Sequence, residues 1–352
     1  MKITKNSFGK LKDGQEVGLF ILENDKNVSV SILSYGARIQ SIKTPNEEGE
    51  LKDIVLGYDN IRDYETDPYY MGALIGPVAG RIANAQYVEE SKTIKLEQNH
   101  QTHHLHGGSH GLHQKLWNYS SEERSGSVKL VMQTFAKDGE GGYAGNREFK
   151  TTYILNNKNQ LLIYMNVQTD KDSMINLTSH SYYNLSDKEN CNILDQIMMI
   201  NAPKVMSMNA DLLPTGGFEY VLGKPANFTR GKKLGEALQV LPNGLDHVYA
   251  INKEYGKFGI SAKALDADSG RTIDLVTNQP AVVLYTNNSA DGSVLGKNSL
   301  PIIKHGAFCL EPMHFPDSPN QLNFPSILLK AGETYKSRSQ FTFGLVSQSH
   351  HH

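Results

Sequence analysis

Apolar and polar residues alternate in short runs along the chain, which is the two-residue period of a β-strand with one buried face. The runs that show it most clearly are Val28–Ser34, Thr93–Leu96 and Ser127–Met132. Helical periodicity is nearly absent, and only Asp59–Tyr64 and Lys232–Leu238 predict one short helical turn each. We therefore expect most of the chain to form β-strands.

Several pairs of strand-like runs are separated by loops rich in Asn, Asp or Gly, an arrangement typical of β-hairpins. The clearest pair is Thr151–Leu155 and Leu161–Val167, with Asn156–Gln160 between them. The same pattern recurs within residues 260–276 and within residues 326–343. Many strands, with 31 glycines available for turns, predict an all-β fold built as a large antiparallel β-sandwich.

The chain shows no short repeat, no low-complexity tract and no Pro/Ser-rich linker. A prior of ~150 residues per domain suggests two domains, but all-β domains are often longer than that. We therefore predict a single β-sandwich domain over residues 1–346. Residues 347–352 form a polar tail ending in three histidines, which is typical of the remnant of a purification tag.

The charge balance argues against nucleic acid or an anionic membrane as the main partner. The chain has 35 Lys and Arg against 37 Asp and Glu, a net charge of −2, and therefore no strong basic field. No apolar run is long enough to cross a bilayer, and no secretory signal is visible at the N-terminus. The two cysteines, Cys191 and Cys309, make no disulfide framework, so we expect two buried thiols and a cytoplasmic location.

Six of the 13 histidines lie between residues 100 and 113. Neutral imidazole is a common metal ligand, but the spacing matches neither HExxH nor a facial triad. We therefore predict no metal site and expect most of the six to be solvated loop residues. His106 differs because Gly107 and Gly108 follow it, and two glycines let a ligand approach. A plain glycine-rich turn is the alternative interpretation.

Three further positions offer acid–base groups. His180 stands among hydroxyl, amide and aromatic residues that can fix its tautomer, although a satisfied core histidine would look the same. Glu311 follows an apolar run, so we expect it at a strand end. Partial burial there would raise its pKa towards the range of a general base, unless it simply exits to solvent. Asp246 and His247 together offer a carboxylate and an imidazole in a turn.

Two other residues suit the binding of a polyol. Arg81, next to a glycine, is a multidentate donor that can hold vicinal hydroxyls, and Tyr182 is a candidate apolar surface for a sugar face. The chain contains no GxSxG, no P-loop and no GxGxxG after a strand. What remains is a set of His, Glu, Asp and Arg side chains that suits proton transfer on a neutral polyol.

Taken together, eight segments resemble the aldose 1-epimerase (mutarotase) family and run in its order, spanning about residues 5–345. They are Ile75–Ala83, Leu105–Gly108 with Trp117, Asp138–Tyr143, Asn176–Leu185, Leu213–Gly216, Gly244–His247, Gln279–Pro280 with Tyr285, and Glu311 with Phe315–Asp317. The resemblance implies a large β-sandwich that interconverts the α and β anomers of a free hexose, such as galactose or glucose, without a cofactor or a metal.

The resemblance also implies a role for each candidate residue. Glu311 would take the proton from the C1 hydroxyl, and His180 would protonate the ring oxygen. His106 would hydrogen-bond the substrate, and Arg81 and Asp246 would bind its hydroxyls. These assignments fit ring opening of a hemiacetal, which needs one proton removed and one supplied in the same pocket.

Some positions depart from the family pattern and leave the preferred sugar open. Gly80 stands where some members carry Asn, and Val283 replaces a Gln that some members use to bind sugar. Three other functions remain as alternatives. They are a glycoside hydrolase with Glu311 and Asp246 as paired carboxylates, a non-catalytic sugar-binding or sensor protein, and an epimerase of a hexose phosphate, for which the sequence shows no cluster of Arg and Lys.

Overall fold

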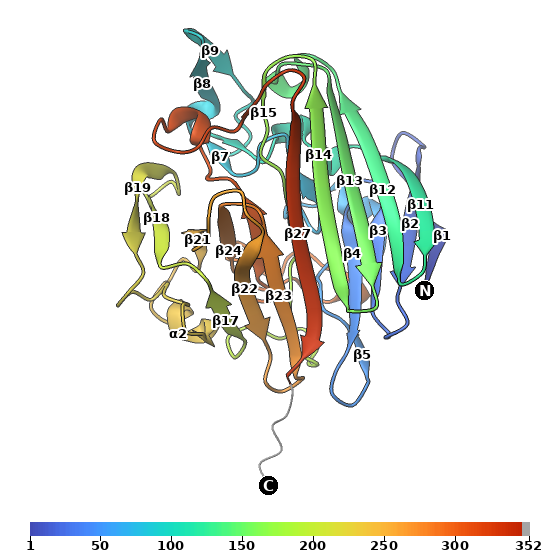
Figure 1. The fold of residues 1–352 in the computed structure, drawn as a ribbon. Coiled ribbons are helices and arrows are strands. Elements are labelled where there is room, and N and C mark those ends of the chain that lie inside the picture. The colour runs from blue at the N-terminus through green and yellow to red at the C-terminus, as the bar shows by residue number, and fades with distance from the viewer. Residues whose placement is uncertain (347–352) are drawn as a thin grey trace.

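A nine-stranded antiparallel sheet is the largest element of the computed structural model, which describes residues 1–346 (Figure 1). The tail predicted at 347–352 lies outside the described residues. In sheet order the strands are β11 (Asn118–Arg124), β12 (Ser127–Ala136), β13 (Arg147–Asn156), β14 (Gln160–Thr169), β27 (Thr334–Leu345), β23 (Arg271–Thr277), β22 (Gly259–Leu265), β17 (Ile197–Ile200) and β20 (Lys232–Lys233).

Two five-stranded antiparallel sheets accompany it. One consists of β1 (Lys2–Lys10), β2 (Glu16–Glu23), β3 (Ser29–Leu33), β4 (Ile39–Pro45) and β5 (Leu51–Asp53). The other, in sheet order, consists of β19 (Pro214–Tyr220), β18 (Lys204–Met208), β21 (Asp246–Ala250), β24 (Ala281–Tyr285) and β25 (Cys309–Met313).

Short elements complete the fold. Four two-stranded pairs are β6 (Leu74–Ile75) with β16 (Thr178–Ser179), β7 (Arg81–Ile82) with β10 (His104–Leu105), β8 (Gln86–Glu89) with β9 (Lys92–Lys95), and β15 (Ser173–Met174) with β26 (Leu328–Leu329). The helices are α1 (Ile61–Glu65) and α2 (Leu234–Leu238). The 3₁₀ turns are Ala83–Ala85, Gly108–His110, Leu112–Gln114, Glu140–Gly142, Lys297–Ser299 and Ser318–Asn320.

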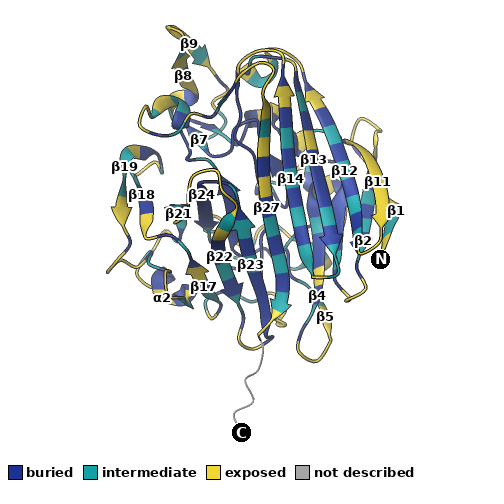
Figure 2. Ribbon diagram, in the orientation of Figure 1, coloured by how far each residue is buried: buried dark blue, intermediate teal, exposed yellow. Residues whose placement is uncertain are grey.

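The core lies between the nine-stranded sheet and the β1–β5 sheet. Burial alternates along β12 and β14, which Figure 2 shows as dark bands that alternate with lighter ones along each strand. Side chains such as Val128 and Leu130 of β12 belong to the same buried cluster as Phe20 and Leu22 of β2. Each such side chain contributes roughly 1.5–3 kcal/mol on burial. This packing confirms the predicted antiparallel β-sandwich.

Most of the predicted elements are present. The runs at 151–167 and 260–276 form the hairpins β13–β14 and β22–β23, and the two predicted helical turns are α1 and α2. The hairpin predicted within 326–343 is wrong, because β26 pairs with β15 and β27 pairs with β14 and β23. Both segments have the right local pattern, but their partners come from far along the chain.

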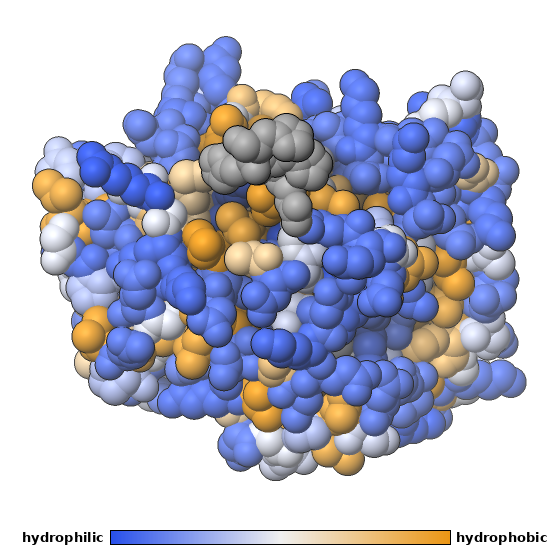
Figure 3. All heavy atoms as spheres, turned by 90° about the horizontal axis from the view of Figure 1, so that it is seen from below, coloured by the Kyte–Doolittle hydropathy of each residue, from blue (hydrophilic) through white to orange (hydrophobic). Residues whose placement is uncertain are grey.

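One face of the molecule is mostly polar. The face seen from below in Figure 3 is largely hydrophilic, with hydrophobic residues scattered over it. Among the described residues, no helix has the length and apolar character needed to span a membrane. Cys309 is buried as expected, whereas Cys191 is partly exposed, and both are free thiols.

Candidate active site

A cavity of about 570 Å³ opens beside β25 and gathers side chains from distant parts of the chain. All six candidate residues line it: Arg81, His106, His180, Tyr182, Asp246 and Glu311. They come from β7, from the residue directly after β10, from the segment after β16, and from the strands β21 and β25. The sequence analysis therefore identified groups that the fold does bring together.

One face of the β21–β24–β25 sheet forms a wall of this cavity. Asp246 pairs with Tyr285, and Val283 pairs with Glu311. Directly paired residues point to the same face of a sheet, and so do residues two apart along a strand. All four side chains therefore share one face, and all four line the cavity. Glu311 lies in the middle of β25, so the expectation that it ends a strand is wrong.

A short strand pair positions two more groups. Leu105 pairs with Arg81, and the His106 N–H donates to the Gly80 carbonyl. Gly80 has φ +81, and a Cβ there would lie 2.9 Å from Pro316. This close approach in a left-handed conformation favours glycine at position 80 of this chain.

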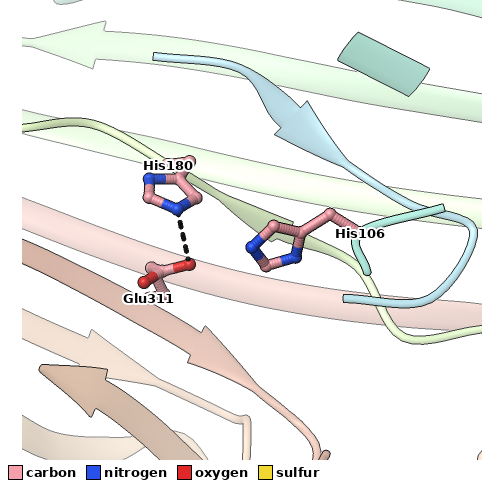
Figure 4. Close-up of side chains that lie close together, drawn as sticks. All are labelled: His106, His180 and Glu311. Atoms are coloured by element: carbon pink, nitrogen blue, oxygen red, sulfur yellow. Dashed lines mark ion pairs between the residues drawn. The ribbon is translucent and has the colours of Figure 1, made fainter. Parts of the chain in front are cut away.

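His180 follows directly after β16 and is held by its own backbone. Its N–H donates to the Ala73 carbonyl, and its carbonyl accepts from the Gly72 N–H. The Nε2 atom of His180 lies 3.4 Å from Oε1 of Glu311, and Figure 4 shows the two side chains pointing toward each other. Both side chains are almost fully buried, with exposed fractions of 6% and 4%.

Burial dominates the protonation of this pair. It raises the pKa of Glu311 well above its usual value; the nearby negative charge of Asp246 adds to this effect, and Arg81 opposes it. Burial also lowers the pKa of His180 to about 4. Both shifts favour the uncharged forms, a protonated carboxyl group and a neutral imidazole.

His106 presents an N–H group to this pair. Its Nδ1 atom accepts a hydrogen bond from the Gly80 N–H, so the ring proton is on Nε2. Figure 4 shows the other ring nitrogen directed toward His180 and Glu311. Burial, together with the charges of neighbouring cationic groups, lowers the pKa of His106 well below its usual value. The ring is therefore a neutral hydrogen-bond donor.

The ligand atoms of His106, His180 and Glu311 lie within 4.8 Å of one another, a spacing that would suit a metal ion. A metal-bound imidazole offers a lone pair to the ion, and its other nitrogen normally donates a hydrogen bond. In His106 the second nitrogen instead accepts one from Gly80, so a proton faces the cavity. The three groups thus suit the movement of protons better than the binding of a cation.

The remaining three candidates differ in how they face the cavity. Arg81 and Asp246 lie 3.7 Å apart and are partly exposed at its wall. Burial raises the pKa of Asp246, and Arg81 opposes that rise. The hydroxyl of Tyr182 donates to the Tyr69 carbonyl and is therefore already engaged. The aromatic ring is the part of Tyr182 that remains available to the cavity.

The sequence analysis missed several features of the site. Four of the six clustered histidines are buried, so the expectation of solvated loop residues is wrong: they are His103, His104, His106 and His113. Tyr70, which lines the cavity beside His106 and His180, was not a candidate. No period or motif marks it in the sequence, because its position depends on a loop conformation.

The comparisons with known proteins point to one family. The aldose 1-epimerase family matches residues 18–342. Galactose mutarotase from Sus scrofa is 33% identical over 98% of this chain and 100% of its own length, and that from Homo sapiens is 34% identical over 98% and 99%. The crystal structure of an aldose epimerase homologue from C. elegans, 26% identical, covers 94% of this chain and 99% of its own with a TM-score of 0.86.

Proposed function

The chain belongs to the aldose 1-epimerase family, and we propose that Glu311, His180 and His106 carry out its reaction. The protein is an isomerase that interconverts the α and β anomers of a free hexose. The observation that carries the residue assignment is the buried contact between Glu311 and His180. Ring opening needs one group to accept a proton and another to donate one within the same pocket.

In this proposal the pair divides the two proton transfers between its members. The Glu311 carboxylate accepts the proton of the C1 hydroxyl, and the His180 imidazolium donates its proton to the ring oxygen O5. The bond between C1 and O5 breaks and leaves an open-chain aldehyde. Rotation about C1–C2 exposes the other face of the carbonyl. The two proton transfers then run in reverse, and the ring closes as the other anomer.

The pair needs one proton in total, and burial affects where that proton resides. After ring opening Glu311 is neutral and His180 is neutral, which is the form that burial favours. The site therefore favours the state that accompanies the open-chain intermediate. Before ring opening, Glu311 is a carboxylate and His180 is an imidazolium, and burial disfavours both charges. The polar C1 hydroxyl and O5 of the bound sugar are suited to stabilise these charges.

His106 acts as a fixed hydrogen-bond donor in this proposal. Because Gly80 keeps its proton on Nε2, the ring can donate to the sugar oxygen that gains electron density as the ring bond breaks. A preorganised donor stabilises that charge without reorganisation during the step. His106 lowers the barrier in this way and does not itself transfer a proton.

Arg81 and Asp246 bind the hydroxyls of the sugar, with Tyr182 supporting the site through its ring. A guanidinium and a carboxylate side by side offer donors and acceptors to neighbouring hydroxyl groups. Among the described residues that line the cavity, Arg81 is the one Lys or Arg, and it is paired with Asp246. This charge balance favours a neutral hexose over a hexose phosphate.

We also propose that residues 1–346 fold as one domain and that the protein acts in the cytoplasm. One buried cluster contains residues from Phe20 in β2 to Phe343 in β27, which supports a single folding unit. Two free cysteines fit a reducing compartment.

Polarimetry tests the proposed reaction. Freshly dissolved α-D-galactose or α-D-glucose should reach anomeric equilibrium faster with the protein than without it. Methyl galactoside, which cannot open without hydrolysis, should release no reducing sugar. Binding of the sugar without acceleration would favour the sensor alternative, and release of reducing sugar would favour the hydrolase alternative.

A further inference from the structure

The ring of Tyr70, which lines the cavity, lies against three imidazoles. Its centroid lies 4.9 Å from that of His106 and 4.8 Å from that of His113, in both cases edge to face. It lies 6.2 Å from that of His180, with the two ring planes only 19° from parallel. One side chain therefore touches both imidazoles of the proposed reaction.

The backbone holds Tyr70 in an unusual conformation. Its φ is +55, in the left-handed region that a bulky residue rarely adopts. Such a conformation costs on the order of 1–3 kcal/mol and persists only where the surroundings enforce it. A side chain kept at this cost in a cavity wall is a candidate for a functional role.

The surroundings that enforce it centre on Asp67. The Asp67 carboxylate accepts from the backbone N–H groups of Tyr69 and Met71, the two neighbours of Tyr70, at 3.0 and 2.6 Å. It is also paired with Arg38 at 3.0 Å, and both side chains are fully buried. Two chain neighbours tied to one buried carboxylate leave Tyr70 little freedom to move.

The same loop is tied to His180. The Gly72 N–H donates to the His180 carbonyl, and the Tyr69 carbonyl accepts from the hydroxyl of Tyr182. The Tyr182 ring lies 5.1 Å from that of His180, with the planes 20° from parallel. The loop thus fixes two aromatic rings that both run nearly parallel to the imidazole of His180.

We propose that Tyr70 is a positioning residue, whose ring sets the relative orientation of His106 and His180 and keeps water from the His180–Glu311 pair. This role rests on the proposed function of those residues. It requires the aromatic ring and not the hydroxyl, which interacts with Asn99 at the far end of the side chain. Proton transfer depends steeply on orientation, and a displacement of about 1 Å can cost on the order of 10²-fold in rate.

The pH dependence of the reaction provides a second readout. Access of water to His180 would move its pKa from about 4 back toward the ordinary value near 6.5. The titratable and charged groups that face or influence His180 are Glu311, His106, His113, Tyr70, Tyr182, Tyr285, Asp67 and Arg38. A substitution of Tyr70 by a neutral residue removes none of these other titratable or charged groups.

Two variants distinguish the contribution of the Tyr70 ring from those of its hydroxyl and of its backbone conformation. Tyr70→Asn removes the ring but tolerates the left-handed conformation, because Asn adopts it readily. Tyr70→Phe keeps the ring. The matched control is His305→Asn, which replaces a ring at another left-handed position, with φ +56, outside the cavity lining. For each variant we would measure kcat and KM by polarimetry from pH 3 to 9, and the thermal midpoint Tm.

Tyr70→Asn should lower kcat on the order of 10²-fold, with a smaller effect on KM, and should move the acid limb of the profile upward. Tyr70→Phe and the control should stay within about threefold of wild type. A folded Tyr70→Asn variant with unchanged kcat and pH profile would overturn the proposal. A Tyr70→Phe variant whose kcat falls tenfold or more would also overturn it. This second test remains informative if Tyr70→Asn does not fold. Glu311→Gln, run in parallel, tests the acid–base assignment separately.

Discussion

Nε2 of His180 lies 3.4 Å from Oε1 of Glu311, in a site where both side chains are buried. The histidine follows the short strand β16, and the glutamate lies in the middle of β25. Two groups whose ionised forms carry opposite charges are thus placed where desolvation pushes each of them toward its uncharged form.

The first prediction concerns the pair itself. Glu311→Gln and His180→Asn should each lower kcat on the order of 10²–10⁴-fold, because each removes one of the two proton-transfer groups. Polarimetry with α-D-galactose measures the loss, and Tm should remain close to that of wild type. Glu333→Gln, at an exposed position, is the matched control. Wild-type rates in the two site variants would contradict the assignment.

The second prediction concerns the pH profile of kcat/KM, which reports the free enzyme. Activity requires one proton on the pair. A second proton must go to His180, whose pKa is about 4, so the acid limb should have its midpoint near pH 4 and not near 6.5. Loss of the single proton ionises Glu311, whose pKa is raised, so the alkaline limb should lie far above 4.5. An acid limb centred near pH 6.5 would show that His180 is hydrated.

The third prediction concerns the charge of Asp246. Asp246→Asn removes a negative charge that raises the pKa of Glu311, so the alkaline limb of kcat/KM should move to lower pH. It also leaves Arg81 without its partner, and KM should rise by about tenfold, the equivalent of one hydrogen bond to a charged group. Asp195→Asn on the exposed surface should change neither quantity. An alkaline limb that stays in place in Asp246→Asn would argue against coupling of the two carboxylates.

The fourth prediction uses Gly80, whose N–H sets the tautomer of His106. In Gly80→Ala the Cβ would meet Pro316 at 2.9 Å at a φ of +81. We expect a loss of stability of about 1–3 kcal/mol and a fall in kcat as the N–H shifts. Gly126→Ala has nearly the same φ, +80, and nothing within 4 Å of its Cβ, so it should lose stability but keep kcat. Equal kcat in the two variants would show that the Gly80 N–H does not contribute to the reaction.

The fifth prediction concerns stability against pH. Burial lowers the pKa of His113 to about 3, while the unfolded chain binds this proton below about 6.5. The unfolded state therefore holds more protons between pH 3 and 6.5, and the free energy of unfolding should fall as pH falls through this window, by up to about 1.4 kcal/mol per pH unit. His113→Gln should reduce the slope measured by denaturant unfolding, and exposed His110→Gln should not. An unchanged slope in His113→Gln would show that this ring is charged when folded.

Local pattern explains which parts of the fold the sequence could predict. A strand period and a nearby turn lie within about twenty residues of sequence, so the β13–β14 and β22–β23 hairpins were predictable. The partners of β26 and β27 were not, because β15, β14 and β23 lie far away in sequence and pairing between distant strands leaves no local signal. The same reasoning applies to Glu311. The apolar residues before it predicted that it would be at least partly buried, but they did not predict its position in the middle of β25.

By itself, the sequence determined the residue types of the site, the β-rich class of the fold and the family resemblance that joins them. Only the tertiary structure decided that Glu311 and His180 meet in a buried pocket, that Gly80 keeps His106 a donor, and that Tyr70 lies against both imidazoles. The reason is physical: a side chain's chemistry is encoded in the residue, but its protonation and orientation depend on burial and neighbours that are brought together only when distant strands pair.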